Sequence, residues 1–159
     1  MKKEELISQL KKEKFSENIL KAFEEVDRSK FVSKEHERFA YENKPLPIGF
    51  GQTISQPYTI AFMLALLDLK DRQKILEVGS GSGYVLALIS EIVGENGRVY
   101  GVEVIRNLAD KSVKTLKSYR NVSIRNVNGK DGLSESAPFD RILISAALQE
   151  IPKTILSQL

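Results

Sequence analysis

The stretch Lys74-Ile-Leu-Glu-Val-Gly-Ser-Gly-Ser-Gly-Tyr84 decides how the rest of the chain is interpreted. The apolar residues at 75, 76 and 78 predict a short buried strand, and those that follow Gly83 predict a helix. Three glycines on alternate positions separate the two elements. A strand, a glycine-rich turn and a helix let a ligand lie against bare backbone, with the amides of the helix N-terminus pointing toward it. We therefore expect a nucleotide-like cofactor at this turn.

The residues around the last glycine distinguish three kinds of glycine-rich turn. A dinucleotide-binding turn requires glycine or alanine at position 84, where Tyr84 is far too large. A phosphate-binding P-loop requires lysine and then serine or threonine after its last glycine, and Tyr84-Val85 supplies neither. The remaining pattern, Glu77-Val-Gly-Ser-Gly-Ser-Gly83, resembles the first motif of the S-adenosylmethionine-dependent methyltransferases. One glycine turn is a weak signal, so the rest of the chain has to support it.

Length and composition limit the class of protein. A chain of 159 residues, 42% of them hydrophobic, is long enough for one globular domain. It has no apolar run of the length of a membrane span, and its first residues lack the apolar core of a signal peptide. Because there is no cysteine, disulfides, a thiol nucleophile and thiolate metal sites are excluded. We expect a single-domain, soluble, cytoplasmic protein without membrane contact.

The charged residues do not indicate a nucleic-acid partner. The net charge is +3, and the lysines alternate with glutamates without an accompanying cluster of aromatic and basic residues. The single histidine, His36, stands in the charged run 34–38, where we assign it no catalytic role. We therefore look for function in the glycine turn and the loops.

The first part of the chain predicts helices and then an irregular loop. Residues 3–13 and 16–27 have the apolar periodicity of amphipathic helices, with Ser16 as the N-cap of the second. The segment 41–57 contains three prolines and two glycines, which predicts a rigid, irregular loop pressed onto the domain. We expect Ser55 to cap the apolar helix that follows this loop.

After the glycine turn, strands alternate with helices. Residues 98–104, 122–127 and 139–147 predict strands, and Pro152 opens a last helix with Ile155, Leu156 and Leu159 facing inward. This order predicts a parallel sheet with right-handed crossovers and helices on both faces, with the ligand crevice at the carboxyl ends of the strands. Gly79–Gly83, Glu103, Lys130–Asp131 and Ser145 all fall at such ends. Glu103 stands where an acidic group reaches the ribose hydroxyls of an adenosine, although an ordinary strand-end carboxylate remains the alternative.

Several stretches together resemble one family, the protein-L-isoaspartate O-methyltransferases. They are Asp27-Arg-Ser-Lys-Phe-Val32, Pro45-Leu-Pro-Ile-Gly-Phe-Gly-Gln-Thr-Ile-Ser-Gln-Pro57, the glycine turn, Gly101-Val-Glu103, Asp131-Gly132 and Phe139–Pro152. The resemblance covers nearly the whole chain, and the motif in 45–57 is absent from other methyltransferases. It implies a Rossmann-like class I fold with an N-terminal helical segment. The single domain would comprise helices in 1–40, an active-site loop in 41–57 and a cofactor-binding part in 58–159.

The family resemblance also implies an activity and a site. The enzyme would use S-adenosyl-L-methionine to methylate the free carboxylate of L-isoaspartyl and D-aspartyl residues in damaged proteins, which initiates their repair. Ser55 matches the active-site hydroxyl, Glu103 the ribose ligand and Asp131 the adenine ligand. The cofactor-binding residues implied in this way are Gln52, Thr53, Ile54, Glu77, Gly79, Ser80, Gly81, Ser82, Gly83, Glu103, Val104, Lys130, Asp131 and Gly132. Three residues depart from the family pattern: Asn43 stands for aspartate, Tyr58 for histidine and Lys130 for glycine.

The chemistry of this reaction agrees with the residues available. An acceptor carboxylate has a pKa of about 3.5–4, so it is ionised at neutral pH and needs no general base. The enzyme then has to position the anionic oxygen and exclude water. A chain without cysteine suits that task better than hydrolysis through an activated thiol.

Two other readings remain open, and the length of the chain adds an expectation. A methyltransferase acting on a small molecule or RNA would favour a base near the crevice, and a non-catalytic cofactor-binding relative is also possible. The family continues past the final helix with strands that complete the sheet, whereas this chain stops at Leu159. We expect the 139–147 strand to have an unpaired apolar edge. On this basis the chain would be a fragment or reduced relative that methylates weakly and self-associates through that edge.

Overall fold

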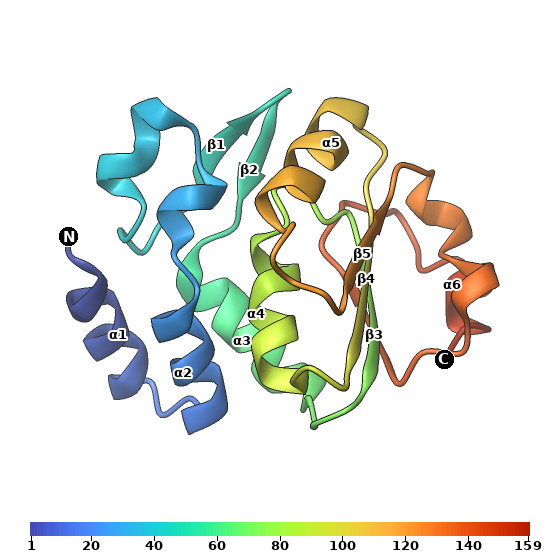
Figure 1. The fold of residues 1–159 in the computed structure, drawn as a ribbon, viewed down its shortest axis with the longest axis horizontal. Coiled ribbons are helices and arrows are strands. Elements are labelled where there is room, and N and C mark those ends of the chain that lie inside the picture. Colours follow the sequence, from blue (N-terminus) through green and yellow to red (C-terminus); the bar gives the residue numbers. More distant parts are fainter.

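The centre of the protein, seen in a computed structural model that describes all 159 residues, is a four-stranded parallel sheet with helices on both faces (Figure 1). Its strands are β3 (Lys74–Val78), β4 (Arg98–Val102), β5 (Val122–Arg125) and β6 (Arg141–Ile144), in the order β5-β4-β3-β6. The chain runs outward from β3 to β5 and then returns to pair β6 with the free side of β3. The direction of winding therefore reverses between β3 and β6, where ligands of open α/β sheets bind. The predicted parallel sheet and Rossmann-like class are confirmed.

Two hydrophobic clusters cover the two faces of the sheet. The larger joins Ile75, Val99 and Leu143 to the helices α3 (Pro57–Leu67), α4 (Tyr84–Val93) and α5 (Arg106–Thr115). The smaller packs Ile155 of α6 (Lys153–Leu156) under the strands, on the opposite side of the sheet in Figure 1. The last helix is shorter than the sequence predicts, and Leu156 and Leu159, expected to face inward, are exposed. A single helical turn cannot bury apolar residues on more than one side.

The N-terminal segment packs against the helix that follows the glycine turn. It consists of the helices α1 (Lys3–Lys12) and α2 (Glu17–Glu25) and the 3₁₀ helices η1 (Arg28–Phe31) and η2 (Lys34–Phe39). The rings of Phe23 and Phe31 lie 6.1 and 5.3 Å from the buried ring of Tyr84. Tyr84, whose side chain is too large for a dinucleotide-binding turn, therefore anchors the N-terminal helices through aromatic contacts. Ser16 precedes α2 as predicted, but its hydroxyl bonds the Asn18 side chain and caps no backbone amide.

The segment 41–57, predicted to be irregular, contains an antiparallel hairpin. Its strands are β1 (Leu46–Gly49) and β2 (Gln52–Ile54), joined by a tip in which residues 49, 50 and 51 all have positive φ. Each strand of this two-stranded sheet has only one partner, so a proline in β1 is tolerated. The prediction gave the prolines more weight than the alternating burial of Leu46 and Ile48, which marks a strand.

The cap of α3 also differs from the prediction. Gln56, and not Ser55, is the N-cap residue, and neither side chain caps the helix. The acceptor is Asn43, whose Oδ1 receives the backbone N–H of Tyr58 at 3.0 Å. The hydroxyl of Ser55 makes no hydrogen bond within the chain and is left free for another role.

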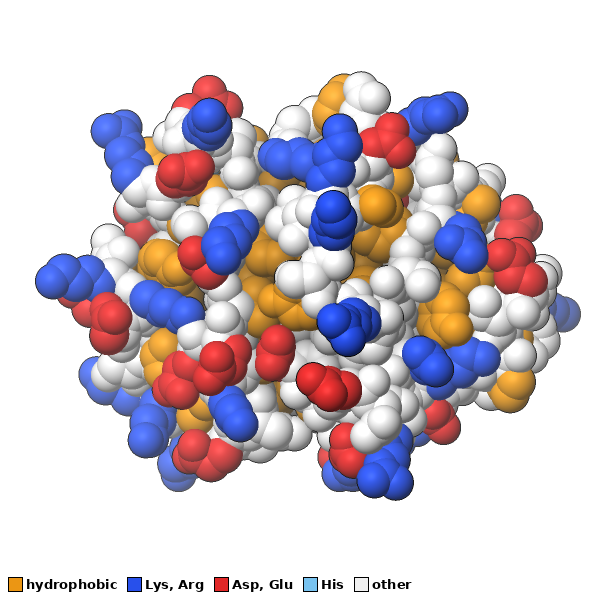
Figure 2. Space-filling view, in the orientation of Figure 1, with side chains coloured by type: hydrophobic (Ala, Val, Ile, Leu, Met, Phe, Trp, Pro, Cys, Tyr) orange, Lys and Arg blue, Asp and Glu red, His pale blue; other side chains and the backbone are white.

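The surface carries charges of both signs. On the face shown in Figure 2, lysine and arginine side chains are interspersed with aspartate and glutamate, as the alternation in the sequence predicts. No helix of the structure is long and apolar enough to cross a membrane.

The two assignments of the α3 cap make different predictions for stability. We expect Asn43→Ala to lower the free energy of unfolding by about 1 kcal/mol, because it removes the acceptor of the Tyr58 amide. Ser55→Ala should change it by less than about 0.5 kcal/mol. Chemical denaturation of both variants measures the difference, and a larger loss for Ser55→Ala would return the capping role to the serine.

Candidate functional site

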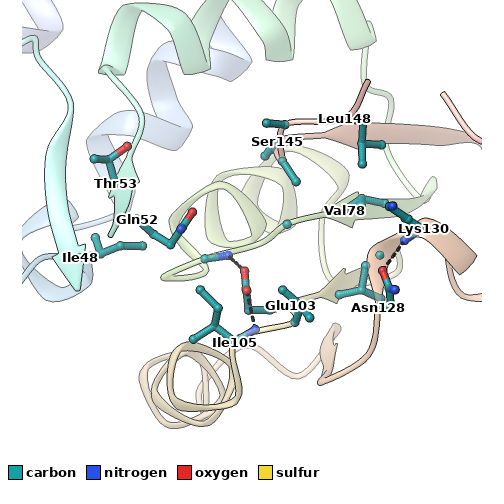
Figure 3. A pocket seen from close by; sticks show the side chains of 17 residues that line it. Ile48, Gln52, Thr53, Val78, Glu103, Ile105, Asn128, Lys130, Ser145 and Leu148 are labelled. Carbon is teal, nitrogen blue, oxygen red and sulfur yellow. Dashed lines mark hydrogen bonds between the residues drawn. The ribbon is translucent and has the colours of Figure 1, made fainter. Parts of the chain in front are cut away.

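A crevice opens at the carboxyl ends of β3, β4 and β6, between the sheet and the β1–β2 hairpin. Its wider part has a volume of about 260 Å³, and a narrower part of about 50 Å³ adjoins it. Both parts are lined by Thr53, Gly79, Gly81 and Ser145, so they lie next to each other. Figure 3 shows Ile48 and Gln52 reaching from the hairpin toward the strand end that carries Glu103.

Other parts of the chain pack closely against the glycine turn at Gly79 and Gly83, but not at Gly81. A Cβ on Gly79 would lie 2.6 Å from that of Ala146, and one on Gly83 would lie 2.7 Å from Leu116 Cδ1. A Cβ on Gly81 would meet only Ile48, at 3.3 Å. Glycine is therefore required at 79 and 83 for close packing, and at 81 the backbone is open to the crevice. All three positions also have positive φ, which favours glycine.

Glu103 fixes the turn from the neighbouring strand end. Its carboxylate is buried and accepts two backbone hydrogen bonds, from Gly81 N and from Ile105 N, both at 2.8 Å (Figure 3). One oxygen thus holds the glycine turn and the other holds the start of α5. Each carboxylate oxygen keeps a second acceptor position, so Glu103 can still bind hydroxyl groups of a ligand.

Glu77, at the end of β3, is a buried carboxyl group with an unpaired oxygen. Ser145 Oγ donates to its Oε1 at 2.7 Å, whereas Oε2 has no partner and the residue lines the narrow part of the crevice. Burial, with a smaller contribution from the negative charge of Glu103, raises the pKa of Glu77 to about 8. A cationic or donor group of a ligand would satisfy this oxygen.

The hairpin and the residue after it supply the opposite wall. Ile48, Gln52 and Thr53 line the wide part, and Thr53, Ile54 and Ser55 line the narrow part. Ser55 is half-buried, and its hydroxyl has no partner within the chain. The free hydroxyl of Ser55 thus lines the same narrow hollow as the glycine turn and Glu77.

A loop after β5 closes the far end of the crevice. Asn128, Gly129 and Lys130 line it, while the side chain of Asp131 is exposed and outside the lining. Gln158, which follows α6, fixes this loop because its side chain accepts from Leu133 N at 2.7 Å and donates to the carbonyl of Asp131 at 2.9 Å. Lys130 has no positive φ, so replacing the usual glycine causes no backbone strain there.

The crevice brings together most of the residues expected to bind the cofactor. Those that line it are Gln52, Thr53, Ile54, Ser55, Glu77, Gly79, Ser80, Gly81, Ser82, Glu103, Val104 and Lys130. Gly83, Asp131 and Gly132 do not line it. Residues that line it and were not predicted as cofactor-binding are Ile48, Val78, Tyr84, Val85, Val102, Ile105, Asn128, Gly129, Ala146, Ala147 and Leu148. Val78 and Val102 adjoin predicted positions at the strand ends, but Ala146 and Ala147 carry no chemical signal in the sequence.

Comparison with known proteins identifies one family. The chain matches the family described as protein-L-isoaspartate(D-aspartate) O-methyltransferase over residues 1–159. It is 45% identical over 161 residues to a protein-L-isoaspartate O-methyltransferase of Methanothrix thermoacetophila. The aligned region covers 100% of this chain and 76% of the relative. A second relative, protein-L-isoaspartate O-methyltransferase 2 of Archaeoglobus fulgidus, is 42% identical over 161 residues, covering 99% of this chain and 74% of its own length.

Two solved structures extend the comparison to three dimensions. A protein-L-isoaspartate O-methyltransferase superposes with a TM-score of 0.94 at 32% identity, covering 99% of this chain and 52% of the other. A structure from Plasmodium falciparum, assigned to the same kind of enzyme and in complex with S-adenosyl-L-homocysteine, gives a TM-score of 0.84 at 26% identity. That match covers 98% of this chain and 78% of the other. The chain thus spans about half of one solved relative and about three quarters of the others.

The raised pKa of the buried Glu77 leads to a prediction of how the free energy of unfolding depends on pH. Its folded-state pKa of about 8 lies above the ordinary value of 4.5, so the folded protein keeps a proton that the unfolded chain has lost in this range. We expect the free energy of unfolding to fall as the pH rises from about 4.5 to about 8, by on the order of a few kcal/mol. Glu77→Gln should remove this part of the dependence, as measured by denaturation across the range. Glu95→Gln, an exposed carboxylate in a turn, is the control; an unchanged slope in Glu77→Gln would contradict the assignment.

Proposed function

The chain belongs to the protein-L-isoaspartate(D-aspartate) O-methyltransferase family, and we propose that the crevice described above is its active site. The family's function is S-adenosylmethionine-dependent methyl transfer to the free carboxylate of isoaspartyl residues in damaged proteins. The observation that supports the location is that the segment carrying the family motif and the glycine turn together line both parts of the crevice. Acceptor and cofactor can therefore meet there.

The residues of the crevice fit S-adenosylmethionine. The open backbone at Gly81 and the unpaired oxygen of Glu77 are suited to its amino-acid part, and the free acceptor positions of Glu103 to its ribose. We assign the loop 128–132 to the adenine, with Asp131 adjoining the lining residue Lys130. When bound, the cofactor supplies a methyl group already activated on a sulfonium.

The chain itself has to hold and orient the acceptor. An isoaspartyl carboxylate is ionised at neutral pH, so no residue needs to remove a proton. Ser55 lines the narrow part of the crevice beside the glycine turn, and its hydroxyl is free. We assign this hydroxyl the role of donating a hydrogen bond to one oxygen of the acceptor carboxylate. The other carboxylate oxygen then points at the methyl group. Ile48 of the hairpin presents an apolar side chain that excludes water from the same space.

The assignment of Glu103 predicts a loss of cofactor affinity. We expect Glu103→Ala to weaken binding about tenfold or more, because charge-assisted hydrogen bonds to the ribose contribute roughly 1.5–3 kcal/mol each. The variant also loses the acceptor of Gly81 N, which adds to the effect. Calorimetric titration with S-adenosylhomocysteine measures the affinity, with Glu95→Ala as a variant of equal charge change. Unchanged affinity would remove Glu103 from the site.

The assignment of Ser55 predicts a loss of turnover with cofactor binding retained. We expect the wild-type chain to methylate an isoaspartyl peptide but not the matching aspartyl peptide, and Ser55→Ala to lower kcat by about tenfold or more. Transfer of label from S-adenosylmethionine measures both. Methylation of RNA or a small molecule in place of the peptide would favour another class of acceptor. Cofactor binding without any transfer would indicate a non-catalytic relative.

We further propose that copies of this chain associate through β6. In these 159 residues β6 pairs only with β3, so the outer edge of its backbone has no strand partner. Beside it, on α3, the side chain of Leu66 is 71% exposed and that of Phe62 is 49% exposed. An open edge next to exposed apolar groups is a template for a second copy.

The expected cytoplasmic location stays a prediction.

If copies of the chain associate through β6, the measured molecular mass should rise with protein concentration. Light scattering of the 159-residue chain should show dimers or larger species as the protein concentration rises. Leu66→Lys on α3, an exposed apolar position beside this edge, should shift the chain toward monomer by placing a charge on that surface. Glu95→Lys, at the exposed turn, is the control. A wild-type chain that stays monomeric at all concentrations would contradict the proposal.

A further inference from the structure

Arg28 is a fully buried cation that has no carboxylate partner. Its guanidinium instead donates hydrogen bonds to four backbone carbonyl oxygens. One terminal nitrogen reaches the carbonyls of Ala40 and Glu42, and the other reaches those of Lys44 at 3.2 Å and Ser55 at 3.0 Å. The residues it joins span the segment 40–55, which contains the whole β1–β2 hairpin. A single side chain thus binds both ends of the segment that carries the proposed active-site hydroxyl.

The same guanidinium also contacts the residue that follows the glycine turn. Its central carbon is 5.8 Å from the centre of the Tyr84 ring, within the range of a cation–π contact. Tyr84 is the first residue of α4 and directly follows Gly83, the last glycine of the turn. Arg28 therefore contacts both halves of the crevice, the hairpin segment through backbone carbonyls and the glycine turn through an aromatic ring.

We propose that Arg28 is a positioning residue for methyl transfer, which sets where Ser55 lies relative to the glycine turn. This inference rests on the function proposed above. Methyl transfer requires the acceptor oxygen and the methyl group to be in line, so a displacement of about 1 Å can cost about a hundredfold in rate. A guanidinium suits this task because its planar fork can bond carbonyls that lie in fixed, different directions.

Charge and burial show why a lysine would not replace it. Burial lowers the pKa of Arg28 to about 10, so the group remains protonated at neutral pH and its donors are retained. A lysine has one nitrogen with three donors on a flexible stem, and it could not reach both the Ala40 side and the Ser55 side of the segment. We therefore expect Arg28→Lys to keep the charge while releasing one end of the hairpin segment.

The test compares the full 159-residue wild type with Arg28→Lys, Ser55→Ala, the double variant, and Leu10→Ala as a control. Leu10 is buried in α1 and does not line the crevice, so its truncation lowers stability without touching the site. We expect Arg28→Lys to lower kcat on an isoaspartyl peptide by about tenfold or more, with cofactor affinity within about threefold of wild type. In the Ser55→Ala background the effect of Arg28→Lys on kcat should shrink to less than about threefold, because the two residues act together. Leu10→Ala should lower the melting temperature and leave kcat unchanged.

Three outcomes would overturn the inference. They are an unchanged kcat in Arg28→Lys, an equal factor of loss with and without Ser55, and an equal loss of kcat in Leu10→Ala at a matched fall in melting temperature. If Arg28→Lys does not fold, Arg28→Gln, which buries no charge, takes its place in the same cycle. If the wild type methylates no isoaspartyl peptide, the proposed function fails, and amide hydrogen exchange separately tests the claim that Arg28 fixes the hairpin segment. Exchange in residues 40–56 should then be faster in Arg28→Lys than in Leu10→Ala, and equal rates would overturn it.

Discussion

At the carboxyl end of β3 the backbone passes so close to Ala146 that no side chain fits at position 79. A Cβ there would stand 2.6 Å from the Ala146 Cβ. The approach is produced by shared acceptors, because Val78 O receives the amides of Ser145 and Ala146, and Val102 O receives those of Gly79 and the next residue. These bonds bring three strand ends together at the point where the winding reverses, and they leave the amides and open backbone of the glycine turn facing a crevice. The crevice that we propose as the cofactor site follows from this crossing more than from any single side chain.

Two carboxylates at neighbouring strand ends are given different properties by their surroundings. Glu103 accepts two backbone N–H groups, from the glycine turn and from the residue before α5. Glu77 has one hydroxyl donor and no solvent, and the charge of Glu103 opposes a second negative charge beside it. Glu103 therefore organises the turn through its backbone contacts, whereas burial raises the pKa of Glu77 and leaves one of its oxygens unpaired.

The sequence predicts the sheet and the glycine turn because both are encoded locally. Strand and helix periodicities on either side of the turn specify the βαβ unit, and Glu103 could be placed from its position at the end of the next strand. The hairpin in 46–54 was missed because prolines, which usually prevent strands, are tolerated where each strand has one partner. The cap of α3 and the contacts of Arg28 were missed for another reason. Asn43 bonds an amide 15 residues away and Arg28 a carbonyl 27 residues away, and no local pattern reveals such pairs.

β6 borders the crevice at its carboxyl end and has an open edge on the side away from β3, and the two features are independent. β6 is held on the crevice side by its pairing with β3 and by the two amides that follow it, which Val78 O accepts. It is held to α3 by Arg141, whose Nε donates to the carbonyl of Leu67 at 2.9 Å. None of these bonds uses the outer edge of the strand. A further strand on that edge would satisfy unpaired backbone groups of β6 and leave the bonds that place Ser145 and Ala146 beside the glycine turn unchanged. The association proposed for this edge would therefore use exposed backbone, and the geometry of the crevice is set by contacts on the other side.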